Sequence, residues 1–155
     1  MVNFWEEIVK NRALWAVFLS GVTAQSLKII IGLFRKRKFN FSWLVDTGGM
    51  PSSHSAAVVS FAICMGKELS YSSPFFALGV LFALITMFDA QTWRRSIGFQ
   101  AKVLNHIMDD LQKKKKIEDY RLRELVGHTP IEVFIGALIG VIVTVAFYKI
   151  GVIKP

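Results

Sequence analysis

The chain has 155 residues, of which 53% are hydrophobic, with a mean hydropathy of +0.44 and a formal net charge of +8. A soluble domain of this length buries only about two-thirds of its surface, so it rarely carries so many apolar residues together with 13 Phe and 4 Trp. The composition therefore disfavours a disordered chain, a disulfide scaffold and an ordinary soluble enzyme. The single cysteine, Cys64, lies in an apolar run and is expected to be a buried small hydrophobe. We expect one small, basic, membrane-embedded domain over residues 1–155.

Four apolar stretches are candidates for transmembrane helices, which need about 20 mostly apolar residues. They lie near residues 13–34, 51–66, 74–90 and 131–148. The second stretch is the shortest, and polar residues crowd its start. The pattern predicts an all-α fold, a polytopic membrane helix bundle with about four transmembrane helices.

The distribution of Lys and Arg orients this predicted bundle. With four spans, the loops 35–50 and 93–130 lie on the same side of the membrane, and they hold 13 of the 19 basic residues. The positive-inside rule places these two loops in the cytoplasm and both termini outside. We therefore expect a multi-pass protein of the cell membrane.

Two sequence features predict helix contacts. Residues 98–116 carry apolar residues at four-residue spacing with polar residues between them, namely Phe99, Val103, Ile107 and Leu111. This spacing is typical of an amphipathic helix, here in the basic cytoplasmic loop, that lies on the membrane surface or against a partner. Gly136 and Gly140 form a GxxxG face in the last apolar stretch, which predicts close packing within one chain or across a homodimer.

Ionisable groups gather at the predicted cytoplasmic ends of the spans. Such groups are costly in or beside a membrane, so each is a candidate for function. They are Lys28, His54, Asp89, the pair Arg94 and Arg95, and His128 with Glu132. Nothing in the hydropathy pattern requires them to share one face of the membrane, so their convergence predicts a single site.

Most of these groups also have a simpler explanation. Lys28 can extend its ammonium to the lipid headgroups, and the two arginines can anchor a helix end or bind anionic lipid. Asp89 can neutralise a nearby arginine. Ser52 and Ser53 can cap the start of a helix. His54 is harder to explain in this way, because a histidine that opens an apolar helix has little structural purpose.

His128 and Glu132 are spaced i, i+4, so on a helix they share a face and can form a hydrogen bond. A carboxylate that holds one imidazole nitrogen fixes the tautomer and leaves the other nitrogen free to attack or to take a proton. Residues 48–55 join glycines to a helix start and offer a phosphate cradle of backbone N–H groups. The two histidines with Asp89 and Glu132 could alternatively bind a metal, but no HxxxH or clustered spacing supports this, and we expect none.

Three short motifs carry a family resemblance. Lys28 and Arg35 have the spacing of KxxxxxxRP, with a lysine where proline is expected. Residues 51–54 read PSSH where the second motif is PSGH, and His128 with Glu132 matches the end of SRxxxxxHxxxD with Glu for Asp. The sequence resembles the phosphatidic-acid phosphatase type 2 and vanadium haloperoxidase superfamily. Over nearly the whole chain it resembles the small divergent bacterial branch described as acid phosphatase/vanadium-dependent haloperoxidase-related.

The resemblance implies hydrolysis of a phosphate ester through a phosphohistidine, with no cofactor. It makes His128 the nucleophile, Glu132 its orienting carboxylate and His54 the general acid. The expected phosphate-binding residues, with Asp89 in a supporting role, are Lys28, Arg35, Ser52, Ser53, Arg94 and Arg95.

The third motif departs from the family pattern at one phosphate-binding position. The arginine expected six residues before the histidine is Leu122 here. Its charge would come from another element through Arg94 or Arg95, or from the neighbouring Arg121 or Arg123.

The resemblance and the predicted topology together indicate the substrate class. A lipid phosphate or an isoprenoid diphosphate of the cytoplasmic leaflet would place its tail among the apolar spans, while the basic rim attracts its headgroup. The alternative is a non-catalytic membrane protein that keeps the pocket to bind an anionic lipid or phosphate. We expect no nucleic-acid partner.

Overall fold

The computed structural model describes residues 3–36, 49–112, 122 and 127–151, and these residues form helices and short connections. The helices are α1 (Phe4–Lys10), α2 (Arg12–Lys36), α3 (Ser53–Leu69), α4 (Pro74–Gln91), α5 (Trp93–Gln112) and α6 (Pro130–Ile150). Within the described ranges there is no strand, so the expected all-α class is confirmed.

Three helical stretches are long and apolar enough to cross a membrane. They are Arg12–Phe34, Pro74–Asp109 and Pro130–Ile150, and they contain three of the four predicted spans. The middle stretch comprises α4 and most of α5, and at 36 residues it is about 54 Å long. A hydrocarbon core is about 30 Å thick, so a large part of this stretch must project beyond it.

The fourth predicted span corresponds to α3, a helix of 17 residues that is not among the three long apolar stretches. It packs against α2, α4 and α6. Its buried residues are small or medium in size, namely Ser55, Ala56, Val58, Ser60, Ala62, Cys64 and Gly66. Small side chains let helices approach closely, so α3 lies among other helices and needs less apolar surface than a lipid-facing span. The burial of Cys64 is as predicted.

The GxxxG face of α6 packs against α3 of the same chain. A Cβ atom on Gly136 would collide with the carbonyl oxygen of Ser52, and one on Gly140 would collide with that of Ala56. One turn further along α6, the hydroxyl of Thr144 forms a 2.7 Å hydrogen bond with that of a buried α3 serine. A homodimer through Gly136 and Gly140 is therefore a wrong expectation, because α3 already fills this face.

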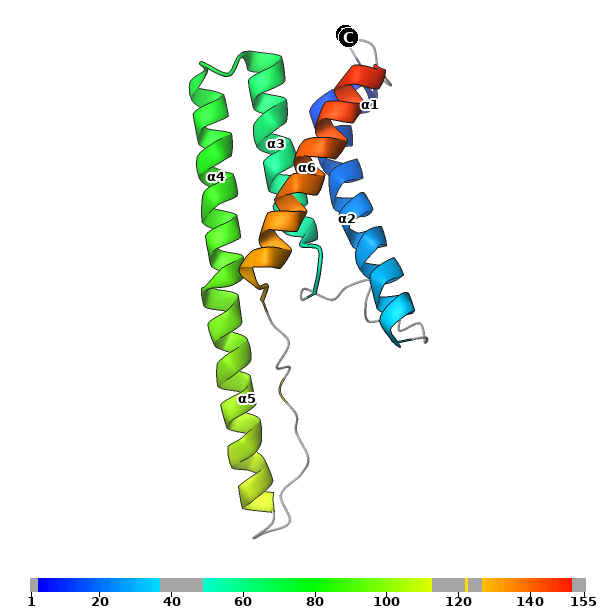
Figure 1. Ribbon diagram of the computed structural model, residues 1–155. Coiled ribbons are helices and arrows are strands. Elements are labelled where there is room, and N and C mark those ends of the chain that lie inside the picture. The colour runs from blue at the N-terminus through cyan, green and yellow to red at the C-terminus, as the bar shows by residue number, and fades with distance from the viewer. Residues whose placement is uncertain (1–2, 37–48, 113–121, 123–126, 152–155) are drawn as a thin grey trace.

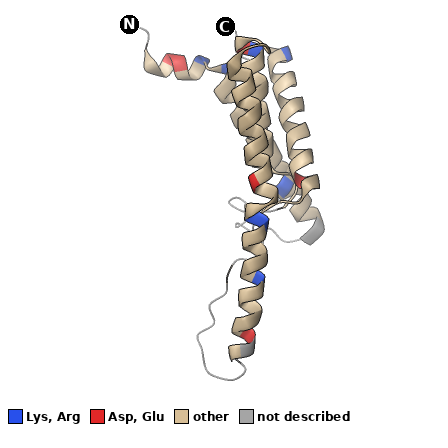
Figure 2. Ribbon diagram, turned by 90° about the vertical axis from the view of Figure 1, so that its left-hand side faces the viewer, with Lys and Arg blue, Asp and Glu red and all other residues tan. Residues whose placement is uncertain are grey.

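The two ends of the bundle are formed by different parts of the chain. At one end lie the last turn of α2, the start of α3, the α4–α5 junction and the start of α6 (Figure 1). At the other end α1 runs across the bundle axis and exposes Phe4 and Trp5, an arrangement typical of a helix at a membrane surface (Figure 2).

The predicted amphipathic helix begins earlier than expected, at Trp93, and is described as far as Gln112; residues 113–116 lie outside the described part. Its axis continues that of α4 and leaves the bundle, as the two side views both show (Figures 1 and 2). When α4 crosses the membrane, α5 therefore stands away from the surface.

Candidate functional site

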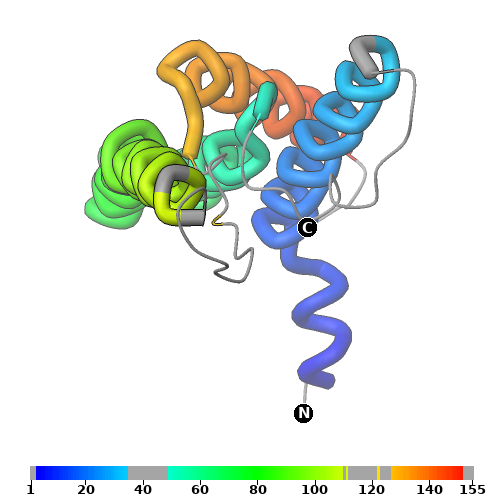
Figure 3. Tube along the Cα trace, turned by 90° about the horizontal axis from the view of Figure 1, so that it is seen from below, coloured from blue at the N-terminus to red at the C-terminus, as the bar shows by residue number. Residues whose placement is uncertain are grey.

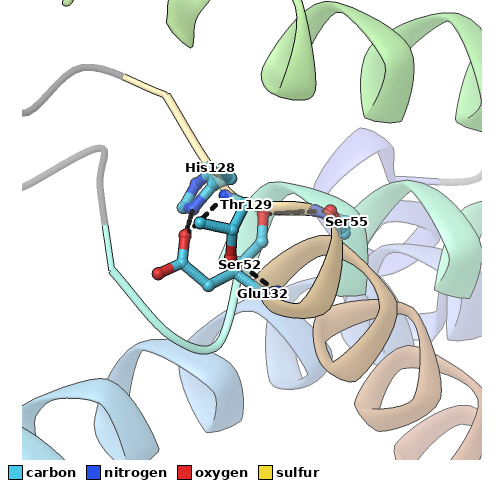
Figure 4. A network of polar contacts seen from close by, with 5 residues as sticks. All are labelled: Ser52, Ser55, His128, Thr129 and Glu132. Atoms are coloured by element: carbon cyan, nitrogen blue, oxygen red, sulfur yellow. Dashed lines mark hydrogen bonds and ion pairs between the residues drawn. The ribbon is translucent and has the colours of Figure 1, made fainter.

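The start of α6 holds Glu132 in a fixed position. Thr129 is the N-cap and Pro130 the first helical residue, both favoured at these positions. The Glu132 N–H donates to the Thr129 hydroxyl at 3.4 Å, and the Thr129 N–H donates to Glu132 Oε2 at 2.9 Å. This reciprocal capping box holds the carboxylate beside the residue that precedes the cap (Figure 4).

That preceding residue is His128, which is only 3% exposed. Its Nδ1 lies 3.3 Å from Glu132 Oε2, and its backbone N–H donates to the carbonyl oxygen of Ala90 at 2.9 Å. Its Nε2 is buried and has no hydrogen-bond partner among the described residues. A carboxylate beside Nδ1 favours the tautomer with its proton there, which leaves the lone pair on Nε2. In this tautomer the Nε2 lone pair is the one that can attack an electrophile or take a proton.

Gly127 allows the backbone to bring His128 to this position. It has a φ of +98°, and a Cβ atom there would collide with the backbone of Arg94 and Arg95 at the start of α5. Glycine is therefore required both for the left-handed backbone and for the close approach. Sequence reasoning missed this residue, although a glycine directly before the His-Thr-Pro run was a visible signal.

The start of α3 lies against the start of α6 through Ser52. The Ser52 N–H donates to the carbonyl oxygen of Glu132 at 3.1 Å. Its hydroxyl is the N-cap of α3 and accepts from both the N–H and the hydroxyl of Ser55, at 3.3 Å and 2.9 Å. Both serines are almost fully buried. Ser52 thus caps the start of α3, as the sequence allowed. Ser53 is the first residue of this helix and is half-buried.

A buried lysine from α2 approaches the pair at α6. Lys28 is only 8% exposed, and its charge acts on both Glu132 and His128. A Cβ atom on Gly49 would lie 3.9 Å from Lys28 Cδ, so the segment before α3 reaches the side chain. A lysine that only extends to lipid headgroups would be exposed. The burial of Lys28 therefore favours a role inside the site.

His54 and Arg94, together with His128, Glu132 and Lys28, form one cluster of ionisable side chains. His54 is exposed in the first turn of α3, and the charges of Arg94 and Lys28 both act on it. Arg94 Nε donates to Asp89 Oδ2 at 2.9 Å, and these two side chains are 41% and 42% exposed. Asp89 thus neutralises a nearby arginine, which is one of the functions considered for it from the sequence.

The remaining predicted site residues are placed less closely. Arg35 is in the last turn of α2, and its side chain lies outside the described part of the structure. Arg95 is exposed, and its backbone rather than its side chain contacts Gly127. Arg121 and Arg123 lie outside the described residues.

Leu122, which stands where the family motif has arginine, lies away from the cluster. Its N–H donates to Asn105 Oδ1 at 2.9 Å, and its carbonyl oxygen accepts from Asn105 Nδ2 at 2.8 Å. Asn105 is about three turns, or about 16 Å, along α5 from Arg94. An arginine at this chain position would not reach the site, whereas Arg94 is already there.

Burial lowers the pKa of His128 below its ordinary value of 6.5, and the charges of Lys28 and His54 act in the same direction. The hydrogen bond and charge of Glu132 oppose this shift. The neutral form of the imidazole is therefore favoured, which is the form that a nucleophile requires. No group of three or more His, Cys, Asp or Glu side chains that could hold a metal occurs in the described ranges.

The fold and the cluster define a helical membrane protein with paired histidines, a lysine and an arginine gathered at one end of its bundle. A family model, the Divergent PAP2 family, matches residues 9–143, and the chain belongs to this family. The chain is also 38% identical over 149 residues to the uncharacterized membrane protein YuiD of Bacillus subtilis (strain 168), with 89% of this chain and 94% of that protein covered. No solved structure matches. The predicted relation to a divergent PAP2 branch is thus confirmed.

Proposed function

We propose that the protein is an integral membrane phosphatase that hydrolyses a lipid phosphate or an isoprenoid diphosphate through a phosphohistidine. The observation that carries this proposal is the state of His128, whose Nδ1 faces Glu132 and whose buried Nε2 has no partner among the described residues. A histidine kept only for packing would not need a carboxylate on one side and cations around it. The family membership supports the same chemistry.

The reaction would proceed in two displacements. In the first, His128 Nε2 attacks phosphorus and the bond from phosphorus to the leaving oxygen breaks, while His54 donates a proton to that oxygen. In the second, His54 takes a proton from water, whose oxygen attacks phosphorus and releases the histidine. Glu132 stabilises the positive charge that the imidazole gains. Lys28 and Arg94 stabilise the negative charge on the non-bridging oxygens.

The position of the site along the bundle supports a lipid substrate. From Arg12, next to the surface helix α1, to Lys28 the helix α2 rises about 24 Å. The hydrocarbon core is about 30 Å thick, so Lys28 lies near the opposite boundary, where headgroup phosphates are found. The N–H groups at the start of α3, with Ser53 and Arg95, would add phosphate contacts around this position, and the sequence motif assigns the same function to Arg35. In this proposal α3 crosses the membrane as a fourth span.

We place this end of the bundle in the cytoplasm, because the two loops at this end hold 13 of the 19 basic residues. A membrane-impermeant thiol reagent tests this in a variant without Cys64 that carries a cysteine at position 115 or 154. We expect labelling of position 154 in intact cells and of position 115 only after the membrane is opened. The reverse pattern would move the site to the outer face.

Phosphate release by the purified protein in detergent tests the proposed activity. The substrate panel would contain phosphatidic acid, phosphatidylglycerol phosphate and prenyl diphosphates, each with and without a chelator. We expect turnover of at least one lipid that survives chelation, because the proposed chemistry uses only side chains. Turnover that is lost with the chelator would contradict the phosphohistidine mechanism.

A second candidate is a non-catalytic protein that binds an anionic lipid or phosphate at the same cluster of side chains. Two observations favour it: Leu122 replaces the arginine of the motif, and Glu132 already has a structural function in the capping box. This candidate predicts no release from any member of the panel, together with saturable binding of the same lipids. It also predicts that His128→Asn leaves that binding unchanged.

The pH profile of kcat/KM tests the state of His128. Protonation of this histidine removes the attacking lone pair, so activity falls as the pH drops through its pKa. Because burial lowers that pKa, we expect the midpoint of the acid limb to lie below pH 6.5. Glu132→Gln removes the contact that raises the pKa, so it should move this midpoint to lower pH as well as reduce kcat. An acid limb that moves upward in this variant would contradict the assignment.

A further inference from the structure

Helix α5 carries an exposed stripe with the spacing of a coiled coil. The positions follow one another by four and three residues in turn, and they are Trp93, Ile97, Gln100, Leu104, Ile107 and Leu111. All six are exposed, and the five apolar ones keep between 45% and 72% of their surface accessible. A 4-3 spacing keeps these side chains on one face of a helix that winds gently around a partner. We call these six residues the α5 seam.

The adjacent face of α5 is already covered by the protein's own chain. Ala101 and Asn105 are buried, and Asn105 forms its two hydrogen bonds with the backbone of Leu122. The α5 seam, by contrast, is exposed along its whole length, as are Phe99 and Val103 to one side of it. Seen from below, α4 and α5 lie at one side of the bundle, away from α2, so a second molecule can approach α5 from outside (Figure 3).

We propose that the α5 seam is a homodimer interface at which α5 of two copies forms a parallel coiled coil. Two copies inserted in one membrane in the same sense have parallel α4 helices. Since α5 continues α4, each seam residue then stands at the same height above the membrane as its counterpart. Because counterpart residues stand at the same height, the seams of two copies meet in register. An unrelated partner would need an apolar stripe of the same spacing at the same height above the membrane.

The charges on α5 permit this self-association in a protein of net charge +8. Six residues of α5 flank the seam. Four are uncharged, namely Ser96, Ala101, Val103 and Met108, and the two charged ones, Arg94 and Asp110, lie at opposite ends of the seam and carry opposite charges. The charged Arg95, Lys102 and Asp109 fall on the side away from the seam, in the position that a two-stranded coiled coil leaves in solvent. No like charges would therefore meet across these flanks.

The length of the seam explains why membrane anchorage matters. From Trp93 to Leu111 it spans about 27 Å, or fewer than three heptads, and so short a helix pair is marginal when free in water. Two anchored copies have a high effective concentration in the membrane plane, which favours pairing. Gln100 would face its counterpart in the apolar seam, where a polar pair fixes the register.

Disulfide trapping in membranes tests the proposal. In a Cys64→Ser background, Leu104→Cys places a thiol in the seam and Lys102→Cys places one on the opposite side of the same exposed helix. We expect mild oxidation to produce several-fold more disulfide-linked dimer from Leu104→Cys than from Lys102→Cys. Equal yields from the two variants, or no dimer from either, would overturn the parallel seam.

Co-purification of two differently tagged copies provides a test that does not need a cysteine. We expect the tagged wild-type copies to co-purify and the double variant Leu104→Asp, Ile107→Asp to lose this association. The thermal transition of the double variant, measured alongside, should remain, because both side chains are exposed in one copy. Wild-type copies that never co-purify, including the case in which a different protein occupies α5, would overturn the proposal.

Discussion

His128→Asn is expected to reduce phosphate release by at least about a thousandfold, the scale on which enzymes lose activity when the nucleophile is removed. Asparagine is suited to this test because its amide nitrogen can occupy the position of Nδ1 and keep the contact with Glu132. The variant lacks only the part of the ring that carries Nε2. The backbone bond from residue 128 to Ala90 is also retained. Initial rates and the thermal transition of the purified variant would be measured together.

The matched control is His106→Asn. His106 is an exposed histidine of α5 about three turns beyond Arg94, and it has no place in the proposed chemistry. We expect this variant to keep its activity within about twofold, as surface substitutions usually leave stability and function intact. Rapid quenching of the wild type with a labelled substrate should trap a phosphoenzyme that is labile to acid, and His128→Asn should yield none. Substantial turnover by a folded His128→Asn protein would exclude the histidine as nucleophile.

The convergence of the site could be predicted from sequence because it depends on long apolar runs. Three of the four predicted spans are found as long apolar helices, and the start of α3 lies at the same end of the bundle. The ionisable residues that meet at this end are Lys28, His54, Arg94 and His128. Hydropathy averages over many residues, so it is insensitive to the details of packing. The weakest signal belonged to α3, because a helix enclosed by other helices can use small and polar residues where a lipid-facing helix needs large apolar ones.

Features that depend on one close contact could not be predicted in this way. The choice between a GxxxG contact within the chain and one across a dimer requires knowing that α3 lies against Gly136. The departure at Leu122 likewise has no visible consequence in the sequence. In the structure the backbone at this position pairs with Asn105 on α5, about three turns from Arg94. Family motifs are linear, whereas the charge they require can come from any element that reaches the site.

The capping box shows why the simpler interpretation of a residue need not exclude a chemical one. Glu132 Oε2 accepts from the Thr129 N–H and also lies beside His128 Nδ1. The bond from the backbone holds the carboxylate in place without using a second side chain. A carboxylate positioned in this way can orient the imidazole with little loss of conformational freedom, so the helix start stabilises α6 and organises the proposed nucleophile together.

Arg94→Ala is expected to reduce kcat/KM by about a hundredfold, because a charged hydrogen bond to a phosphate oxygen in a partly buried site contributes on the order of 3 kcal/mol. The guanidinium is well placed for this function. Its Nε is bound to Asp89, and the two terminal nitrogens carry four further N–H donors. Arg94→Lys should recover only part of the loss, because an ammonium cannot form the two-point contact.

Two controls separate the position of Arg94 from its charge. Arg95→Ala removes an equal charge from the next residue, whose side chain is exposed. We expect kcat/KM to fall only a few-fold in this variant, mainly through KM. Adding Leu122→Arg to the Arg94→Ala variant restores the arginine of the family motif at its usual chain position. We expect no rescue, because Leu122 lies beside Asn105 rather than at the cluster. Full rescue by Leu122→Arg, or an equal loss in Arg95→Ala, would show that a different arginine binds the phosphate.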